Sequence, residues 1–233
     1  MKRNVSLEEI SDGRLYGEND MVKADCHGCK GCSKCCHGMG ESIVLDPYDI
    51  YRLQVGEGLG FSELLSSGKI ELNVVDGVIL PNLRMVENVQ MRDGQGTVGK
   101  MRTPQCAFLD ATSRCSIHKS RPGICRLFPL GRYYENGDFK YFLQTGECAE
   151  TNRSKVKVSK WIDTPNLRSY HNFLCTWHYF LNDVEEKVGS LEDMEAGKRL
   201  NMLMLQTFYM VPYEVGEDFY TQFATRMNGF SKK

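Results

Sequence analysis

Cysteines crowd into one short segment of this chain, and their spacing constrains the fold more than any other feature. The chain has ten cysteines in 233 residues. Five of them fall within eleven positions, at Cys26, Cys29, Cys32, Cys35 and Cys36. Cysteines two residues apart on tight turns can direct their sulfurs at one ion or cluster, with backbone amides facing those sulfurs. A packed core has no need of such spacing, so the segment predicts a metal site.

A disulfide framework is the main alternative for clustered cysteines, and the rest of the sequence disfavours it. Such frameworks support small secreted domains that lack a sufficient core, whereas 233 residues can build an ordinary one. The first ten residues contain no apolar run of the length that a signal peptide needs, and no later run is long enough to cross a bilayer. We therefore expect a cytoplasmic protein, in whose reducing compartment clustered cysteines more often bind metal.

The charge balance argues against polyanionic partners. The chain carries 29 basic and 30 acidic residues, with no long block of either sign. This composition predicts no nucleic-acid partner and no membrane-surface partner. The short basic stretch at 153–160 is expected to be an exposed connector.

Turn residues and hydrophobic periodicity predict an α+β fold in three parts. Residues 1–25 form an N-terminal arm, either extended or a short helix, and residues 26–150 form a cysteine-bearing metal-binding domain. That domain should contain a strand at 42–45, helices at 47–56 and 62–65, and hairpins at 69–89 and 132–144. The glycine-rich stretch 92–99 is expected to be a loop, because it lacks the spacing of a phosphate-binding motif. Residues 151–233 form a helical part packed on that domain.

Polar residues mark the expected helix starts. Asp46 before Pro47 is a typical N-cap followed by a proline at the first helical position. Ser159 should cap a short helix, and Asn166 should cap a longer helix that runs to about Val188. Two more helices are predicted at 192–210 and 217–227.

The first cysteine cluster allows two metal-binding registers. One uses Cys26, Cys29, Cys32 and Cys36, which have the C-x2-C-x2-C-x3-C spacing of bacterial ferredoxins. The other uses Cys29, Cys32, Cys35 and Cys36. Because neighbouring side chains usually diverge, one of the adjacent pair Cys35 and Cys36 could face a different partner or a second ion. His27 and His37 flank the cluster and are expected to be exposed loop histidines.

A second block of cysteines, at Cys106, Cys115 and Cys125, points to a family. Its spacings are too long for a simple zinc ribbon, so tertiary folding must gather them. The whole pattern resembles the YkgJ-type cysteine-cluster proteins, described as a zinc- or iron-chelating domain. Their signature is a C-x2-C-x2-C-C knot followed by C-x-x-L, C-x-I and R-P-x-x-C-R-x-F-P. The matching residues are Cys29, Cys32, Cys35, Cys36, Cys106, Leu109, Cys115, Ile117, Arg121, Pro122, Cys125, Arg126, Phe128 and Pro129.

The resemblance implies a bound iron–sulfur cluster or zinc. His118 stands where the family more usually has tyrosine, and Cys26 is an addition to the knot. Both metals accept four thiolates, and the repeated C-x2-C spacing favours a 4Fe-4S cluster over zinc. The number of cysteines also allows two sites, for example one from the first segment and one from Cys106, Cys115, Cys125 and Cys148. Arg121, Arg126 and Arg132 could offset thiolate charge, or Arg121 and Pro122 could simply start a turn or short helix.

Three polar residues on the long helix suggest a further site, which we expect to be structural. His171, Cys175 and His178 are spaced four and three residues apart and so share one stripe of the helix. Beside them, Tyr170, Leu174, Trp177 and Leu181 form the stripe that should face the core. The trio is predicted to flank the core rather than to bind metal.

Three functions are compatible with these features. The first is a metal-binding protein whose iron–sulfur cluster is structural, redox-active or used for delivery. The second is an S-adenosylmethionine-dependent protein lysine methyltransferase, because flagellin lysine N-methyltransferases carry a similar cysteine domain. No Rossmann-type glycine fingerprint supports this function. The C-x3-C-x2-C order of radical enzymes is also absent, because Met39 stands where the third cysteine would follow Cys32 and Cys36. The third is a zinc-organised interaction module. Besides the metal ion or cluster, a protein substrate or partner is compatible with the sequence.

Overall fold

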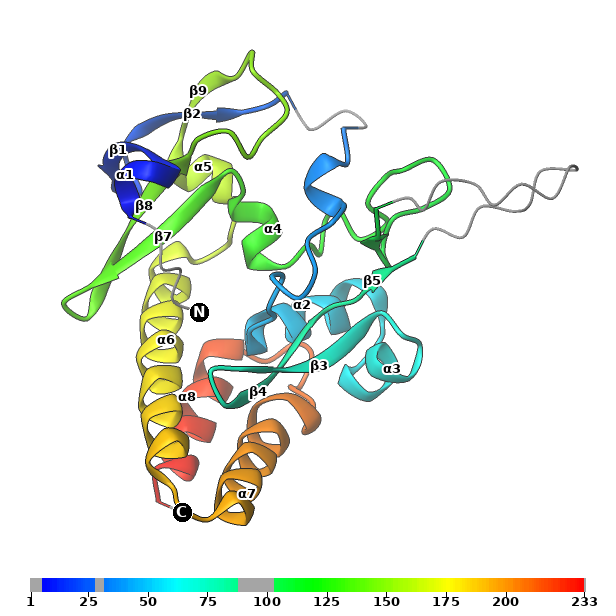
Figure 1. Ribbon diagram of the computed structural model, residues 1–233, viewed down its shortest axis with the longest axis vertical. Helices are drawn as coiled ribbons and strands as arrows, with labels where there is room; N and C mark the ends of the chain where they lie inside the picture. Colours follow the sequence, from blue (N-terminus) through cyan, green and yellow to red (C-terminus); the bar gives the residue numbers. More distant parts are fainter. Residues whose placement is uncertain (1–5, 28–31, 88–102, 233) are drawn as a thin grey trace, which may run out of the picture.

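The computed structural model describes residues 6–27, 32–87 and 103–232 (Figure 1). It is a mixture of short antiparallel strand pairs in the first two thirds and helices in the last third, which confirms the predicted α+β class. The strands are β1 (Ser11–Tyr16), β2 (Met21–Asp25), β3 (Ile70–Val75), β4 (Val78–Leu83), β5 (Met85–Val86), β6 (Gln105–Cys106), β7 (Leu130–Glu135), β8 (Asp138–Gln144) and β9 (Ser154–Lys157). The helices are α1 (Leu7–Ile10), the 3-10 turn η1 (Lys34–Cys36), α2 (Pro47–Glu57), α3 (Phe61–Ser66), α4 (Gly123–Leu127), α5 (Val158–Ile162), α6 (Leu167–Ser190), α7 (Met194–Leu205), the π-helical turn η2 (Gln206–Met210) and α8 (Phe219–Phe230).

Two tight hairpins form where the sequence predicts them. The β3–β4 turn is made by Asp76 and Gly77, and the β7–β8 turn by Asn136 and Gly137. All four residues have positive φ, as two-residue hairpin turns of the favoured hand require. The β7–β8 hairpin gains β1 on its other edge, which gives a three-stranded sheet in the order β1-β8-β7.

The N-terminal segment is more structured than an arm. Residues 11–25 form β1 and β2, and these strands pair with β8 and β9, more than 120 residues later in the chain. Such long-range pairings leave no local signal, since the pairing partner supplies the edge that makes the segment a strand. The three-part division of the chain itself stays a prediction.

Other local predictions differ in detail. The expected strand at 42–45 is an extended segment that makes one bridge, between Val44 and Asn82 of β4. Helix α5 begins at Val158, so Ser159 lies inside it instead of capping it. The capping box at Asp46 and the Asn166 cap of α6 are confirmed. The predicted loop at 92–99 lies outside the described residues.

One hydrophobic core connects the cysteine-bearing part to the C-terminal helices. Aromatic rings from α2, α6 and α8 contact one another, with the Tyr48 and Phe219 ring centroids 4.9 Å apart. Trp177 of α6 packs against Phe208 of η2 at 5.2 Å. In Figure 1 α6 and α8 lie side by side below the β7–β8 hairpin, and the β3–β4 pair lies beside them. Among the described residues, no helix is both long enough and apolar enough to cross a bilayer.

Candidate metal centre

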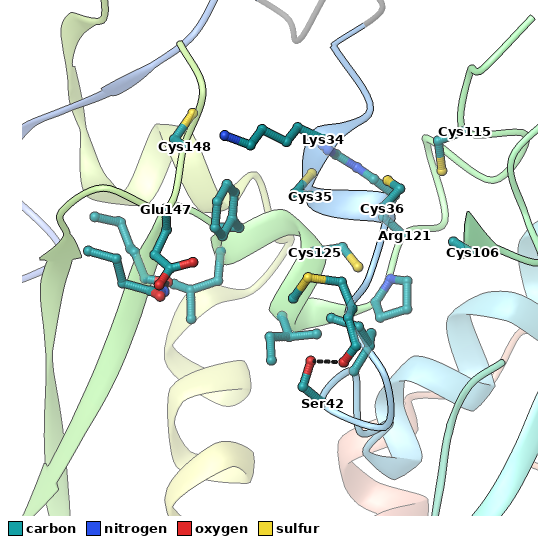
Figure 2. Close-up of a pocket in the computed structure, with 18 of the residues that line it drawn as sticks. Lys34, Cys35, Cys36, Ser42, Cys106, Cys115, Arg121, Cys125, Glu147 and Cys148 are labelled. Carbon is teal, nitrogen blue, oxygen red and sulfur yellow. Dashed lines mark hydrogen bonds between the residues drawn. The ribbon is translucent and has the colours of Figure 1, made fainter. Parts of the chain in front are cut away.

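Five thiols from the two cysteine blocks gather on one wall of a cavity. Cys35 and Cys36 lie on η1, Cys106 ends β6, Cys115 follows a turn, and Cys125 lies on α4. Figure 2 shows their side chains grouped on one side of the cavity. Each of the five interacts electrostatically with at least two of the others. The chain therefore brings together sulfurs that lie about 70 to 90 positions apart in the sequence.

Backbone contacts fix the two blocks against each other. Gly38 donates its N–H to the carbonyl of Pro104 at 2.8 Å, and His37 bridges to Gln105. The β5–β6 pair then sets Cys106 opposite Met85. These links hold η1 beside β6, so that Cys35, Cys36 and Cys106 face the same cavity.

The Cys115 turn is built by one aspartate. Asp110 accepts hydrogen bonds from the backbone N–H groups of Thr112 and Arg114, at 2.8 and 2.9 Å. The turn closes with a bridge between Leu109 and Cys115. Local side-chain acceptors of this kind stabilise tight turns, and here the turn returns the chain to the cavity wall.

Helix α4, which carries Cys125, docks on α2 through a buried carboxylate. Asp49 Oδ1 accepts the N–H of Gly123 at 2.6 Å, and Asp49 Oδ2 accepts the N–H of Asp46 at 3.1 Å. Arg126 donates to the carbonyl of Arg121 at 3.1 Å and to the hydroxyl of Thr164. The stretch around Cys125 thus forms a short helix after Arg121 and Pro122, which is one of the two alternatives that the sequence left open.

Backbone N–H groups point at two of the sulfurs. The N–H of Phe108 donates to the Cys106 sulfur, and the N–H of Ile117 donates to the Cys115 sulfur. Both contacts lower the pKa of the thiol that receives them, although burial raises the pKa of both thiols more. Hydrogen bonds of this kind stabilise thiolates and tune the metals that thiolates bind.

The adjacent pair Cys35 and Cys36 converges instead of diverging. A hydrogen bond with Cys36 lowers the pKa of Cys35 to about 6, so Cys35 is a thiolate at neutral pH. The same hydrogen bond, followed by burial and by the nearby sulfurs, raises the pKa of Cys36. The 3-10 turn allows this because its tighter winding differs from an extended chain, on which neighbouring side chains alternate.

Burial and mutual repulsion keep the remaining sulfurs protonated without a cation. The pKa of Cys125 is raised first by burial, then by the charges of Cys106, Asp49, Cys35 and Cys115. A bound cation would relieve this repulsion and displace the protons. The donor set consists of sulfur alone, which suits zinc or an iron–sulfur cluster better than a hard ion. The site therefore fits either metal of the sequence-based prediction.

Arg121 and Lys69 place positive charge near the thiols, and of the two only Arg121 was singled out from the sequence. Arg121 lowers the pKa of both Cys35 and Cys115 by its charge. Lys69 does the same for Cys106, and its Nζ donates to the carbonyl of Ala107 at 2.8 Å. No spacing signal marks Lys69, which lies 37 residues before Cys106 and reaches it only through the fold. Arg126 and Arg132 instead lie over the ring of Tyr170.

The other predicted ligands are Cys26, Cys29, Cys32 and Cys148, and only some of them line the cavity. Cys32 and Cys148 also line the cavity, and Figure 2 shows Cys148 beside Lys34, across the cavity from Cys106 and Cys115. Cys26 is buried at the end of β2 and is not among the lining residues. Cys29 lies outside the described residues. The two blocks thus do not form spatially separate groups.

The histidines near the cysteines do not join the five thiols. His37 places Nδ1 2.9 Å from the carbonyl oxygen of Ser33, within its own turn. His27 is exposed, and its backbone N–H donates to Asp25 at 2.9 Å. His118 lines the cavity at an exposed position. His171 and Cys175 lie elsewhere, on α6.

The cavity is larger than a metal ion requires. Its volume is about 510 Å³. Apolar side chains cover much of its surface beside the thiols, among them Met39, Leu127, Leu130 and Phe142. Glu147 supplies a carboxylate on the side of Cys148, and Gln144 also lines the cavity.

Comparison with known proteins agrees with this geometry. A family model described as "CxxCxxCC: Putative zinc- or iron-chelating domain" matches residues 28–149. The matched range begins just before Cys29 and ends just after Cys148, so it contains all seven cavity cysteines. Neither a curated protein nor a solved structure matched the chain.

Proposed function

The chain belongs to the CxxCxxCC family of zinc- or iron-chelating domains, and from that premise we propose that it holds a 4Fe-4S cluster at the five-thiol wall. The observation that carries the proposal is the gathering of Cys35, Cys36, Cys106, Cys115 and Cys125 at one large cavity. Metal binding follows from the family. The identity of the metal and the role of each cysteine are our proposal.

The size and openness of the site favour a cluster over zinc. Structural zinc sites are closed, with four ligands packed around one ion. Here the thiols border a cavity of about 510 Å³, and seven cysteines line it. A cluster of several irons and sulfides needs such room, and the cysteines beyond four leave ligands for a second ion.

The surroundings of the thiols suit a cluster of net negative charge. Arg121 and Lys69 lie close enough to lower thiol pKa values, and two backbone N–H groups donate to the sulfurs. Charge and hydrogen bonding at the sulfurs are the means by which proteins set the reduction potential of such clusters. We therefore favour a redox or structural role, with delivery of the cluster as the remaining option.

The methyltransferase and the zinc-organised interaction module stay predictions. An enzyme needs a substrate site next to its metal, and the apolar part of the cavity has the volume for one. Binding of S-adenosylmethionine to protein purified without oxygen would support the enzyme, and no measurable binding would count against it.

The test is metal analysis on matched variants. Protein purified without oxygen should contain iron and acid-labile sulfide in near-equal amounts and absorb broadly in the visible range. Cys125→Ser should lose most of both, because Cys125 is buried among the other sulfurs. Cys175→Ser is the control and should keep its iron and sulfide, since this cysteine lies on α6 away from the cavity. Zinc without sulfide, or full iron in Cys125→Ser, would contradict the proposal.

A further inference from the structure

A second group of metal-ligand side chains lies at the tip of the β7–β8 hairpin, away from the thiol cavity. Asp138 begins β8, and His171 and Cys175 lie one turn apart on α6. One ligand atom from each residue lies within 4.8 Å of the others. None of the three lines the thiol cavity. In Figure 1 the hairpin tip is beside the start of α6, at the left edge of the molecule.

The three side chains share one oxygen. His171 Nε2 lies 2.6 Å from Asp138 Oδ1, and Cys175 Sγ lies 3.9 Å from the same atom. Nitrogen, oxygen and sulfur donors together are the set that zinc accepts in proteins. Zinc–ligand bonds of about 2.0–2.3 Å place the ligand atoms of a tetrahedral site ~3.5 Å apart. Small side-chain rotations would therefore bring the group into coordination.

A fourth residue supports the histidine from its other side. His171 Nδ1 is buried and makes no hydrogen bond, and Glu18 Oε1, in the β1–β2 turn, lies 3.3 Å from it. Histidines that bind metal through one ring nitrogen usually donate the other N–H to a carboxylate, which fixes the ring orientation. Glu18 stands in that position, so Nε2 is left for the metal.

Packing holds the hairpin tip on α6. The rings of Phe139 and His171 stack with centroids 4.3 Å apart and an interplanar angle of 17°. The N–H of Gly137 donates to the hydroxyl of Tyr179 at 2.9 Å. One helical turn beyond Cys175, the ring of His178 stacks on Tyr134 with centroids 3.7 Å apart, which accounts for its position on the same stripe. The ligand positions are thus held before any ion binds.

We propose that Asp138, His171 and Cys175 form a zinc site, with Glu18 orienting His171 through Nδ1. The fourth position of a tetrahedral ion would go to water. Zinc would displace the thiol proton of Cys175 to solvent and replace the proton between His171 and Asp138. The ion would tie the β1–β2 turn and the β7–β8 hairpin to α6. The site uses no cysteine of the cavity, so it stands independently of the cluster assignment.

The experiment compares zinc binding in matched variants of the full chain, each purified without oxygen and with its thiol cavity loaded as isolated. Zn²⁺ is titrated by calorimetry, and retained zinc is measured by elemental analysis after gel filtration. The wild type should retain one zinc equivalent more than Cys175→Ser. Glu18→Gln should bind this zinc 10–100-fold more weakly, as expected for loss of a carboxylate that orients a ligand. Glu195→Gln, an exposed carboxylate on α7 that pairs with Lys198, is the control and should match the wild type.

Thermal unfolding with and without zinc shows whether each variant is folded and whether zinc stabilises it. Zinc should raise the unfolding temperature of the wild type and leave that of Cys175→Ser unchanged. If Cys175→Ser fails to fold, Asp138→Asn replaces it, because this side chain is 67% exposed and the amide keeps its shape. Equal zinc content and affinity in the wild type and the folded variant would overturn the proposal, and would leave the group as an ion pair of His171 with two carboxylates.

Discussion

At the scale of residues, the two carboxyls at the start of α2 have pKa values above their usual range. Asp46 and Asp49 cap α2, and each side chain accepts the backbone N–H of the other. Burial, followed by the charge of Asp49, raises the pKa of Asp46 to about 8. Burial likewise raises the pKa of Asp49, against the charge of Arg126. At neutral pH the pair therefore holds a proton that the unfolded chain would release.

Because the folded protein holds this proton, its free energy of unfolding depends on pH. Because the pKa of Asp46 is higher in the folded state, its contribution to stability is complete below pH 3.8 and is lost as pH rises through about 8. Asparagine keeps the cap but cannot ionise. Asp46→Asn should therefore gain stability relative to the wild type between pH 4 and 8, by at most ~1.4 kcal/mol per pH unit.

Urea unfolding at several pH values would test this. Asp193→Asn is the matched control, because Asp193 caps α7 with a side chain that is 60% exposed. Its stability profile should run parallel to that of the wild type. A parallel profile for Asp46→Asn as well would mean that Asp46 is already ionised in the folded protein.

At the scale of elements, the position of α4 decides where Cys125 lies. Gly123 opens this helix, and a methyl group there would overlap the buried hydroxyl of Tyr170. Gly123→Ala should cost about 1–3 kcal/mol, as overpacking does, and should lower the iron content by shifting Cys125. Removing the hydroxyl with Tyr170→Phe should recover part of that loss. A double variant no more stable than the sum of the single effects would refute the overlap.

The sequence predicted these elements where their signals are local. Asn136–Gly137 and Asp76–Gly77 specify their hairpins because both residues of each pair accept positive φ. Asp46 and Pro47 specify the start of α2 in the same way. The pairing of β2 with β9 could not be predicted, since its partners lie about 130 residues apart and no local signal links the two strands.

In the candidate metal centre too, the features with a local sequence signal could be predicted, and those that depend on the fold could not. Cysteine spacing predicted the candidate ligands, because residue type and interval indicate chelation, and which of them bind metal stays a prediction. It could not place Lys69 beside Cys106 or Asp138 beside His171, since those contacts exist only after the hairpins have docked. One of the two predicted registers had Cys35 and Cys36 at one site, but the sequence did not decide between it and a divergent pair, because that depends on the 3-10 turn.

For the molecule as a whole, metal binding should stabilise a region that the C-terminal helices do not stabilise by themselves. Residues 107–122 contain no helix and no strand beyond isolated bridges, and they lie between the sulfurs of Cys106 and Cys125. The helices are held separately: the Tyr209 hydroxyl donates to the carbonyl of Leu45 at 3.0 Å, within the aromatic core. Metal loss should therefore loosen the first region and spare the second.

Removing the metal with a chelator should lower the unfolding temperature while keeping most of the helical circular dichroism. Ligand linkage sets the scale, since a site loaded at 1,000 times its Kd contributes ~4 kcal/mol to stability. Cys125→Ser should already unfold at the lower temperature and respond little to the chelator, because its site is incomplete. Proteolysis should then cut within 107–122 faster in the metal-free protein than in the loaded protein, because this stretch has no helix or strand beyond isolated bridges. An unchanged unfolding temperature, or simultaneous loss of the helical signal, would mean that the thiols and the aromatic core form one cooperative unit that does not depend on metal.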